Sequence, residues 1–333
     1  MASEEFSAKR RTSFPLWASV PAYALVYGLG VPIVKTLEAF GHWPGVLSGL
    51  RARIGDRART RMGGGFGDYR PSEHDVFACS YAKSGTNWLL QMTTQIAGRG
   101  QGDFGHIHDV APWPDFPGAS FAIPLEDEAP WRASPTGLRV IKTHSPASEV
   151  PYADAARYIV VVRDPKSVCV SAYYFTKALM FGPLMPSIEH WADFFMKSGF
   201  PLGDWAEHVA GYWALRERPN VLFLTYEQMV RDARVTVERL AGFMGVDLTP
   251  AELDRVVHLS SFDHMKSIST KFDFFKATPW SKAEGAMIRR GQRGASGELL
   301  SSATQARLDD YFRAELRRLD CDFPYDEAFG PAA

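Results

Sequence analysis

The sequence predicts an α/β fold in which helices flank a parallel β-sheet, with an N-terminal extension that is both apolar and basic. Short runs rich in β-branched and aromatic residues recur along the chain, and their near-continuous apolar character is typical of strands covered on both faces. Segments of helical length separate these runs, as expected for a parallel sheet. With 333 residues, 46% of them hydrophobic, the chain is long enough to bury a core.

The predicted strands and helices alternate after residue 70. Strands are expected over Val76 to Tyr81, Leu138 to Thr143, Tyr158 to Val162 and Val221 to Thr225. Apolar spacing predicts helices over Asn87 to Ala97, Ser167 to Leu179, Ala206 to Arg216, Arg231 to Met244 and Ala303 to Leu319. Between the first two strands, the segment from Gly102 to Ser134 is rich in proline, tryptophan and phenylalanine and is expected to shape a pocket.

A glycine-rich stretch, RMGGGFGDYRP, separates the two predicted parts of the chain, an extension over residues 1–70 and a main domain over residues 71–325. The extension contains Thr12 to Val34, which has no charged residue, and the basic residues Lys9, Arg10 and Arg11 precede it. This apolar segment is long enough to cross a bilayer, although Pro15, Pro21 and Pro32 are expected to break a regular helix. Spanning a membrane and packing as ordinary core remain open, and lying on a membrane or over an apolar pocket is favoured.

The bulk charge and the cysteines exclude several classes of protein. The net charge of −1 gives no sign of a nucleic-acid-binding protein. Three widely separated cysteines, Cys79, Cys169 and Cys321, argue against a disulfide framework and indicate a reducing compartment. No cysteine or histidine spacing typical of zinc is present, and the pair His106 and His108 lacks further ligands, so no metal is expected.

The stretch YAKSGTNW, residues 81–88, has the form of a P-loop-like, anion-binding turn between a strand and a helix. Gly85 permits close approach of the backbone, and the N–H groups at the start of a helix point at an anion. Lys83 adds a charge, while Ser84 and Thr86 add two hydroxyl donors. The order differs from the Gly-Lys-[Ser/Thr] turn of nucleoside triphosphatases, which disfavours a P-loop kinase.

Three further stretches carry chemistry. In VVRDPKSVCVSAYYF, Arg163 ends a strand and Ser171 follows eight residues later, which suits a second phosphate. In RVIKTHSP, Lys142 and His144 are two residues apart and should share one face of a strand. In IRRGQRG, three arginines lie between glycines and are suited to a multiply charged ligand: Arg289, Arg290 and Arg293.

Taken together, these motifs resemble the cytosolic sulfotransferases that use 3′-phosphoadenosine 5′-phosphosulfate (PAPS), and the resemblance covers residues 71–320. YAKSGTNW resembles the family's Tyr-Pro-Lys-Ser-Gly-Thr-Thr-Trp loop, and KTHSP its Lys-Thr-His-Leu-Pro motif. LTYE and SSFDHMK resemble two further family motifs, in the same order. The resemblance implies the sulfotransferase fold, PAPS as donor and a cytoplasmic enzyme.

The resemblance also implies roles for individual residues. His144 is the expected general base, and Lys83 and Lys142 are expected to stabilise negative charge during transfer. The expected donor-binding residues are Lys83, Ser84, Gly85, Thr86, Asn87, Trp88, Arg163, Ser171, Tyr226, Ser260, Phe262, Arg289, Arg290 and Gly291. Residues expected at the acceptor are His108, Phe175 and Phe181, and the stretch from Phe175 to Phe195 is interpreted as a lid over the acceptor pocket.

The C-terminal part departs from the family pattern. After Arg289, Arg290 and Gly291, Ala295 and Ser296 replace an expected Asp-Trp pair, and LLSSATQARL replaces the family's dimer motif. The oligomeric state is therefore left open. The predicted activity is transfer of a sulfuryl group from PAPS to a hydroxyl or amine of an apolar, lipid-like acceptor, with a small-molecule kinase and a catalytically silent nucleotide- or lipid-binding protein as alternatives.

Overall fold

The structure, a computed structural model, describes residues 16–42, 65–116, 121–198, 203–273 and 295–330, together with residues 45, 49, 278 and 288. Its centre is a sheet of four parallel strands in the order β2-β1-β3-β4. The strands are β1 (Asp75–Ser80), β2 (Arg139–Thr143), β3 (Arg157–Val162) and β4 (Val221–Thr225). The predicted fold class is confirmed, and every predicted strand agrees with the structure within one residue at either end.

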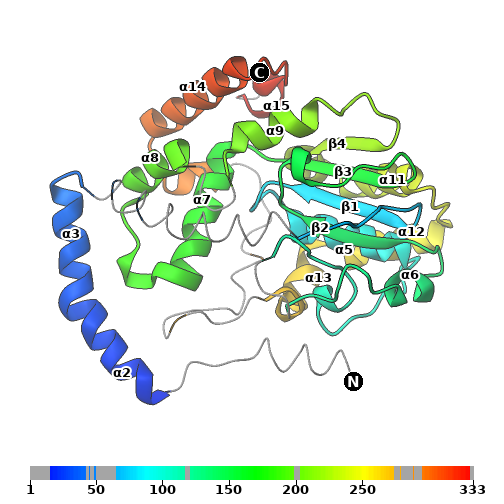
Figure 1. Ribbon diagram of the computed structural model, residues 1–333, viewed down its shortest axis with the longest axis horizontal. Helices are drawn as coiled ribbons and strands as arrows, with labels where there is room; N and C mark the ends of the chain where they lie inside the picture. Colours follow the sequence, from blue (N-terminus) through cyan, green and yellow to red (C-terminus); the bar gives the residue numbers. More distant parts are fainter. Residues whose placement is uncertain are drawn as a thin grey trace.

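Long helices cover both faces of the sheet, as Figure 1 shows. One face packs against α5 (Thr86–Ala97), α11 (Ala233–Met244) and α12 (Pro250–Leu259). The other packs against α7 (Pro165–Thr176), α8 (Ile188–Ser198), α9 (Trp205–Trp213) and α14 (Ser302–Arg318). Successive strand side chains point to opposite faces, so Phe77 and Cys79 enter the second core while Val76 and Ala78 enter the first.

Short helices make up most of the remaining regular structure. The α-helical ones are α6 (Ala129–Ala133), α10 (Tyr226–Arg231), α13 (Phe262–Ser267) and α15 (Tyr325–Phe329). The 3₁₀ turns are η2 (Ile107–Asp109), η3 (Ala147–Glu149), η5 (Gly182–Leu184), η6 (Ser269–Phe272) and η7 (Ala295–Glu298). A π-helical segment, η4 (Lys177–Phe181), continues α7.

One lid prediction and one helix prediction need correction. The stretch from Phe175 to Phe195 is not a lid throughout, because its second half is the core helix α8, in which Trp191 is fully buried. Gly182 and Pro186 precede this helix and do not interrupt it. The helix expected over Arg231 to Met244 begins at Ala233, because Asp232 ends α10 and its side chain caps the start of α11.

The N-terminal helix, by which we mean the consecutive elements α2 (Leu16–Leu25), η1 (Val26–Gly30) and α3 (Val31–Ala39), runs through both of its prolines. This corrects the expectation that they break it. The ring of Pro32 would meet the carbonyl group of Gly28 in a regular helix, and the wider π turn of η1 lies at that point. Among the described residues, no helix combines the length and the apolar composition needed to cross a membrane.

Candidate functional site

The motif residues meet at one edge of the sheet because parallel strands end on the same side. The turn with Lys83 follows β1, His144 follows β2, Arg163 follows β3 and Tyr226 follows β4. Since β1 lies between β2 and β3, the lysine turn is flanked by the histidine on one side and the arginine on the other.

The turn after β1 has an unusual backbone conformation. Both Lys83, at φ +70°, and Gly85, at φ +98°, lie in the left-handed region, which costs about 1–2 kcal/mol for a residue with a side chain. Gly85 is also closely approached, since a Cβ atom there would lie 2.5 Å from a ring carbon of Tyr226. A 2.7 Å hydrogen bond between the hydroxyl groups of Ser80 and Thr86 joins the end of β1 to the start of α5 across the turn.

The residues expected around the nucleotide contact one another. Arg163 Nη1 donates to the carbonyl oxygen of Lys83 at 3.1 Å, and its guanidinium carbon lies 4.2 Å from the centroid of the Tyr226 ring. The Trp88 ring packs edge-on against Tyr226 at 5.8 Å, and Trp88 Nε1 donates to the Ser260 carbonyl oxygen at 2.7 Å. These contacts join segments that are up to 172 residues apart in the sequence.

Three polar atoms among these residues are buried without a hydrogen-bond partner: Ser84 Oγ, Arg163 Nε and Ser260 Oγ. Leaving one such atom unsatisfied in the interior costs about 1–3 kcal/mol. They come from three separate motifs, and all three can donate to an anionic oxygen. The site therefore fits a ligand with more than one phosphate or sulfate group, such as PAPS.

His144 is held in its neutral form. Its Nδ1 lies 2.7 Å from the carbonyl oxygen of Ser80, which only accepts, so Nδ1 carries the proton and Nε2 keeps its lone pair. Burial and the neighbouring charge of Lys142 hold the pKa of His144 well below its usual value. The imidazole is thus unprotonated at neutral pH.

A buried lysine and carboxylate accompany this histidine. Lys142 Nζ lies 3.3 Å from the centroid of the Trp113 ring, and the His144 ring packs edge-on against the same indole at 5.4 Å. One oxygen of Asp115 accepts from Thr143 Oγ1 and from the backbone N–H groups of His144 and Ser145. Burial lowers the pKa of Lys142 to about 7 and raises that of Asp115, so both charges are costly here.

Aromatic side chains surround the histidine and lysine on the expected acceptor side. Trp113 stacks on His108 at 5.1 Å and contacts Phe116 and Phe121. His108 therefore lies against Trp113, and its Nδ1 is hydrogen-bonded to the Ala111 carbonyl oxygen. Two residues of the segment that was expected to shape a pocket, Trp113 and Asp115, border His144.

The end of α7 contributes a further aromatic side chain. Lys83 Nζ lies 4.1 Å from the centroid of the Phe175 ring, so this phenylalanine borders the anion-binding turn. Phe181, in η4, packs against the second core.

Other predicted residues are placed less closely. Asn87 is in the first turn of α5, Ser171 is half-buried on α7, and Phe262 starts α13 with 39% of its surface exposed. The predictions for Arg289, Arg290 and Gly291 fall outside the described residues. Within the described ranges, no cluster of three potential metal ligands occurs.

Sequence reasoning missed Trp113, Asp115 and His208. Trp113 and Asp115 lie in the irregular segment before β2, where no periodicity distinguishes them from the other aromatic and acidic residues. His208, on α9, is fully buried between Tyr81 and Tyr212, and neither ring nitrogen has a hydrogen-bond partner. Burial lowers its pKa to about 3, so it too is neutral.

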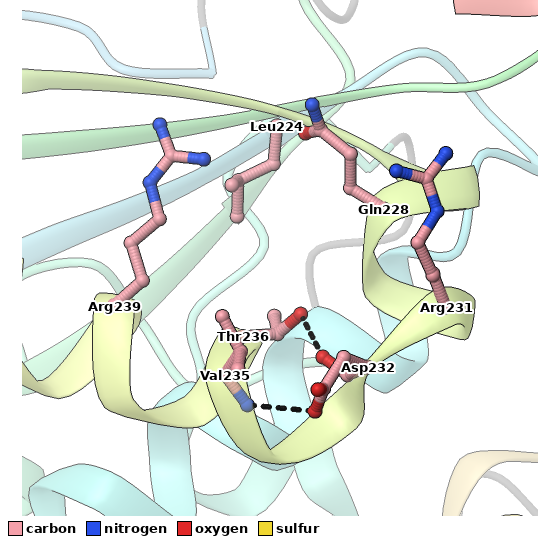
Figure 2. Close-up of a pocket in the computed structure, with 7 residues that line it drawn as sticks. All are labelled: Leu224, Gln228, Arg231, Asp232, Val235, Thr236 and Arg239. Carbon is pink, nitrogen blue, oxygen red and sulfur yellow. Dashed lines mark hydrogen bonds between the residues drawn. The ribbon is translucent and has the colours of Figure 1, made fainter.

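A shallow hollow elsewhere on the surface involves none of the predicted site residues (Figure 2). Arg231 and Arg239 stand at its two sides, with Leu224 and Val235 between them. It opens beside α10 and α11, and two of its polar groups, the Val235 N–H and the Thr236 hydroxyl, donate hydrogen bonds to Asp232 at the start of α11. We assign it no part in the reaction.

Known proteins resemble this chain in sequence. The sulfotransferase domain family matches residues 73–320. Sulfotransferase 2A1 from Macaca fascicularis is 28% identical over 76% of this chain and 88% of its own, and 3-beta-hydroxysteroid sulfotransferase from Cavia porcellus is 30% identical over 58% and 67%.

Solved structures share the fold. Mouse sulfotransferase SULT7A1, complexed with 3′-phosphoadenosine 5′-phosphate (PAP), superposes with a TM-score of 0.60 at 21% identity, covering 79% of this chain and 91% of its own. Retinol dehydratase in a complex with retinol and PAP gives a TM-score of 0.58 at 20% identity, covering 80% and 88%.

Proposed function

Because the chain belongs to the sulfotransferase family and is a PAPS-dependent enzyme, we propose that it sulfates a hydroxyl or amine of an apolar, lipid-like acceptor with His144 as general base. The observation that carries the base assignment is the hydrogen bond from His144 Nδ1 to Ser80, which leaves Nε2 as a proton acceptor. The low pKa of His144 keeps this nitrogen unprotonated at neutral pH.

We place the sulfuryl donor, PAPS, at the carboxyl ends of the parallel strands. Lys83, Ser84 and the N–H groups at the start of α5 would hold the 5′-phosphosulfate, as the family loop implies. Arg163, with Ser171, would hold the 3′-phosphate, and Trp88 and Tyr226 would pack beside the base. The unsatisfied atoms Ser84 Oγ, Arg163 Nε and Ser260 Oγ support this placement, because a phosphate-rich ligand would give each a partner.

Two lysines supply the positive field for the reaction. Lys142 is buried next to His144, and Lys83 lies on the adjoining turn, so both would stabilise the negative charge that moves to the leaving phosphate. Asp115 holds the backbone around the histidine in place, because its carboxylate accepts hydrogen bonds from the N–H groups of His144 and Ser145. The base and the lysines are therefore held by neighbours before the substrates arrive.

The acceptor class follows from the walls beside the base. Trp113, Phe116 and Phe121 form an aromatic cluster next to His144, and Phe175 closes the side near Lys83. An apolar alcohol suits such walls better than a sugar or peptide. The relatives named for hydroxysteroids support the same class.

Labelled PAPS, offered with hydroxysteroids, long-chain alcohols, long-chain amines and small phenols, tests the proposal. We expect sulfation of the large apolar acceptors, and we expect His144→Ala to reduce turnover by about 10²–10⁴ while PAP affinity stays nearly unchanged. His258→Ala, on the exposed side of α12, is the control. Wild-type turnover in His144→Ala would place the base elsewhere.

A further inference from the structure

Most exposed large hydrophobic side chains of the described residues belong to the N-terminal helix and its end. They are Tyr23, Leu25, Tyr27, Leu29, Ile33 and Phe40, with exposed fractions between 37% and 71%. Elsewhere in the described ranges, only Val235 and Phe262 are of this kind. Isolated exposed hydrophobic residues are ordinary, but a set concentrated on one helix marks an interaction surface.

The helix is attached to the rest of the protein along one line. Val26 and Val34 are buried, and Gly30 between them packs on Leu184, where a Cβ atom would lie 2.7 Å from a side-chain carbon. One turn further on, Glu38 accepts a hydrogen bond from the backbone N–H of Ser187. The spacing of four places these residues on one side of the helix.

Apolar side chains flank this line on both sides. Leu25, Leu29 and Ile33 each precede an attached residue by one position and form a row, and Tyr23 with Tyr27 forms a second row, their rings 6.2 Å apart. A helix that is apolar around its circumference is typical of a buried or lipid-contacting helix. In Figure 1 this helix lies at the margin of the molecule, remote from the sheet.

We propose that the N-terminal helix is a docking element for an anionic lipid surface, lying along the headgroup boundary with Leu25, Leu29 and Ile33 in the apolar layer. Exposed tyrosines are suited to the boundary between headgroups and acyl chains.

The charge of the flanking sequence favours anionic lipid. The helix itself has no charged residue before Lys35, whose side chain is 63% exposed. Five arginines follow the helix and three basic residues precede it, against three acidic residues in the same flanks: Lys9, Arg10, Arg11, Arg51, Arg53, Arg57, Arg59 and Arg61, against Glu4, Glu5 and Asp56. Each cation near an anionic surface contributes about 1 kcal/mol.

Docking would bring the acceptor side of the enzyme to the lipid. The helix contacts η5, which follows η4 directly, and η4 continues the helix that carries Phe175 beside Lys83. This consequence rests on the proposed function, while binding to lipid does not.

Vesicle flotation of the full chain tests the proposal, with vesicles of phosphatidylcholine alone or mixed with phosphatidylserine. Ile33→Glu is the test variant and Val235→Glu its matched control, because both residues are on helices and both are 55% exposed. We expect wild type and Val235→Glu to float with the anionic vesicles at low salt, and Ile33→Glu to lose about tenfold in affinity.

Three results would overturn it: no flotation of wild type, equal flotation of the two variants, or a dimer that dissociates on Ile33→Glu in sedimentation without any vesicle binding. The last would assign the face to a second copy of the chain. PAP binding, measured on the same three proteins, is expected to be equal. A wild type that floats but does not bind PAP would contradict the proposed function alone.

Discussion

Two buried charged clusters lie at opposite ends of β1 and β2, and they differ in how their polar groups are satisfied. At the amino end, Arg139 donates to Asp75 at 2.8 Å, and Tyr69 donates to the other carboxylate oxygen. At the carboxyl end, Lys142 lies over an indole ring, and one oxygen of Asp115 has no hydrogen-bond partner.

The pKa shifts of the two cations follow this difference. Burial alone would lower the pKa of Arg139, but the hydrogen bond and charge of Asp75 raise it above its usual value. Burial lowers the pKa of Lys142 to about 7, because Asp115 offsets desolvation incompletely. The contrast teaches that the polar groups of the amino-end cluster satisfy one another, whereas the carboxyl-end cluster keeps a carboxylate oxygen without a partner and a lysine of lowered pKa, which is typical of a functional site.

The largest effect should come from breaking the amino-end pair. Arg139→Ala leaves the carboxylate of Asp75 buried without its cation, so the free energy of unfolding should fall by about 3–5 kcal/mol. Urea denaturation measures this loss in the free energy of unfolding. Arg132→Ala, which removes the exposed pair with Glu128, should cost less than about 1 kcal/mol. Equal losses in the two variants would contradict a structural role for the buried pair.

At the carboxyl end, Arg163→Ala should weaken PAP binding by about 1.5–3 kcal/mol, because a charge-assisted hydrogen bond is lost. Calorimetry without added metal checks this, and the affinities for PAP and for adenosine 5′-phosphate should converge in the variant. Arg239→Ala, at the hollow of Figure 2, should leave PAP affinity unchanged. If wild type already binds both nucleotides equally, Arg163 does not hold a 3′-phosphate.

The pH dependence of PAP binding tests whether the lowered pKa of Lys142 distinguishes the carboxyl-end cluster. Lys142 has a pKa of about 7 in the free protein, and a bound anion raises the pKa of a nearby lysine, so binding takes up a proton. Affinity should therefore be greatest below pH 7 and fall above it by up to about 1.4 kcal/mol per pH unit, until the pKa of the bound state is reached. Lys142→Met should abolish this dependence. Titrations in buffers of different ionisation enthalpy measure the proton directly.

The smallest effect concerns the hydroxyl of Ser84. Because Ser84 Oγ is buried without a partner, Ser84→Ala should leave the ligand-free protein unchanged or more stable by about 1 kcal/mol. Stabilisation by PAP should at the same time decrease by a similar amount. Thermal unfolding with and without PAP gives both quantities. A ligand-free variant that is clearly less stable would show that the hydroxyl supports the fold.

Much of this arrangement could be predicted from the sequence, because the residues of the site lie close in sequence to the strands that position them. The strands are near-continuous apolar runs. His144, Arg163 and Tyr226 directly follow three of them and Lys83 lies in the turn after the first, so a parallel sheet brings them to one common edge. The roles of these residues stay predictions that the experiments above address.

The remainder depends on contacts between distant segments. Asp115 meets His144 across 29 positions, and Trp113 meets Lys142 from a segment without periodicity. Helix α8 was missed because glycine and proline before it were interpreted as interruptions. The π turn that lets the N-terminal helix pass Pro32 has no sequence signal of its own.

The contact between Gly85 and Tyr226 has a consequence for the order of assembly. Gly85 belongs to the turn after the first strand, and Tyr226 follows the fourth, at the outer edge of the sheet. During synthesis the lysine turn therefore emerges long before the ring that packs against its glycine. A nascent chain that ends before residue 226 has the anion-binding sequence without one of its walls. Packing of the Tyr226 ring against Gly85 accordingly requires that the last strand has docked.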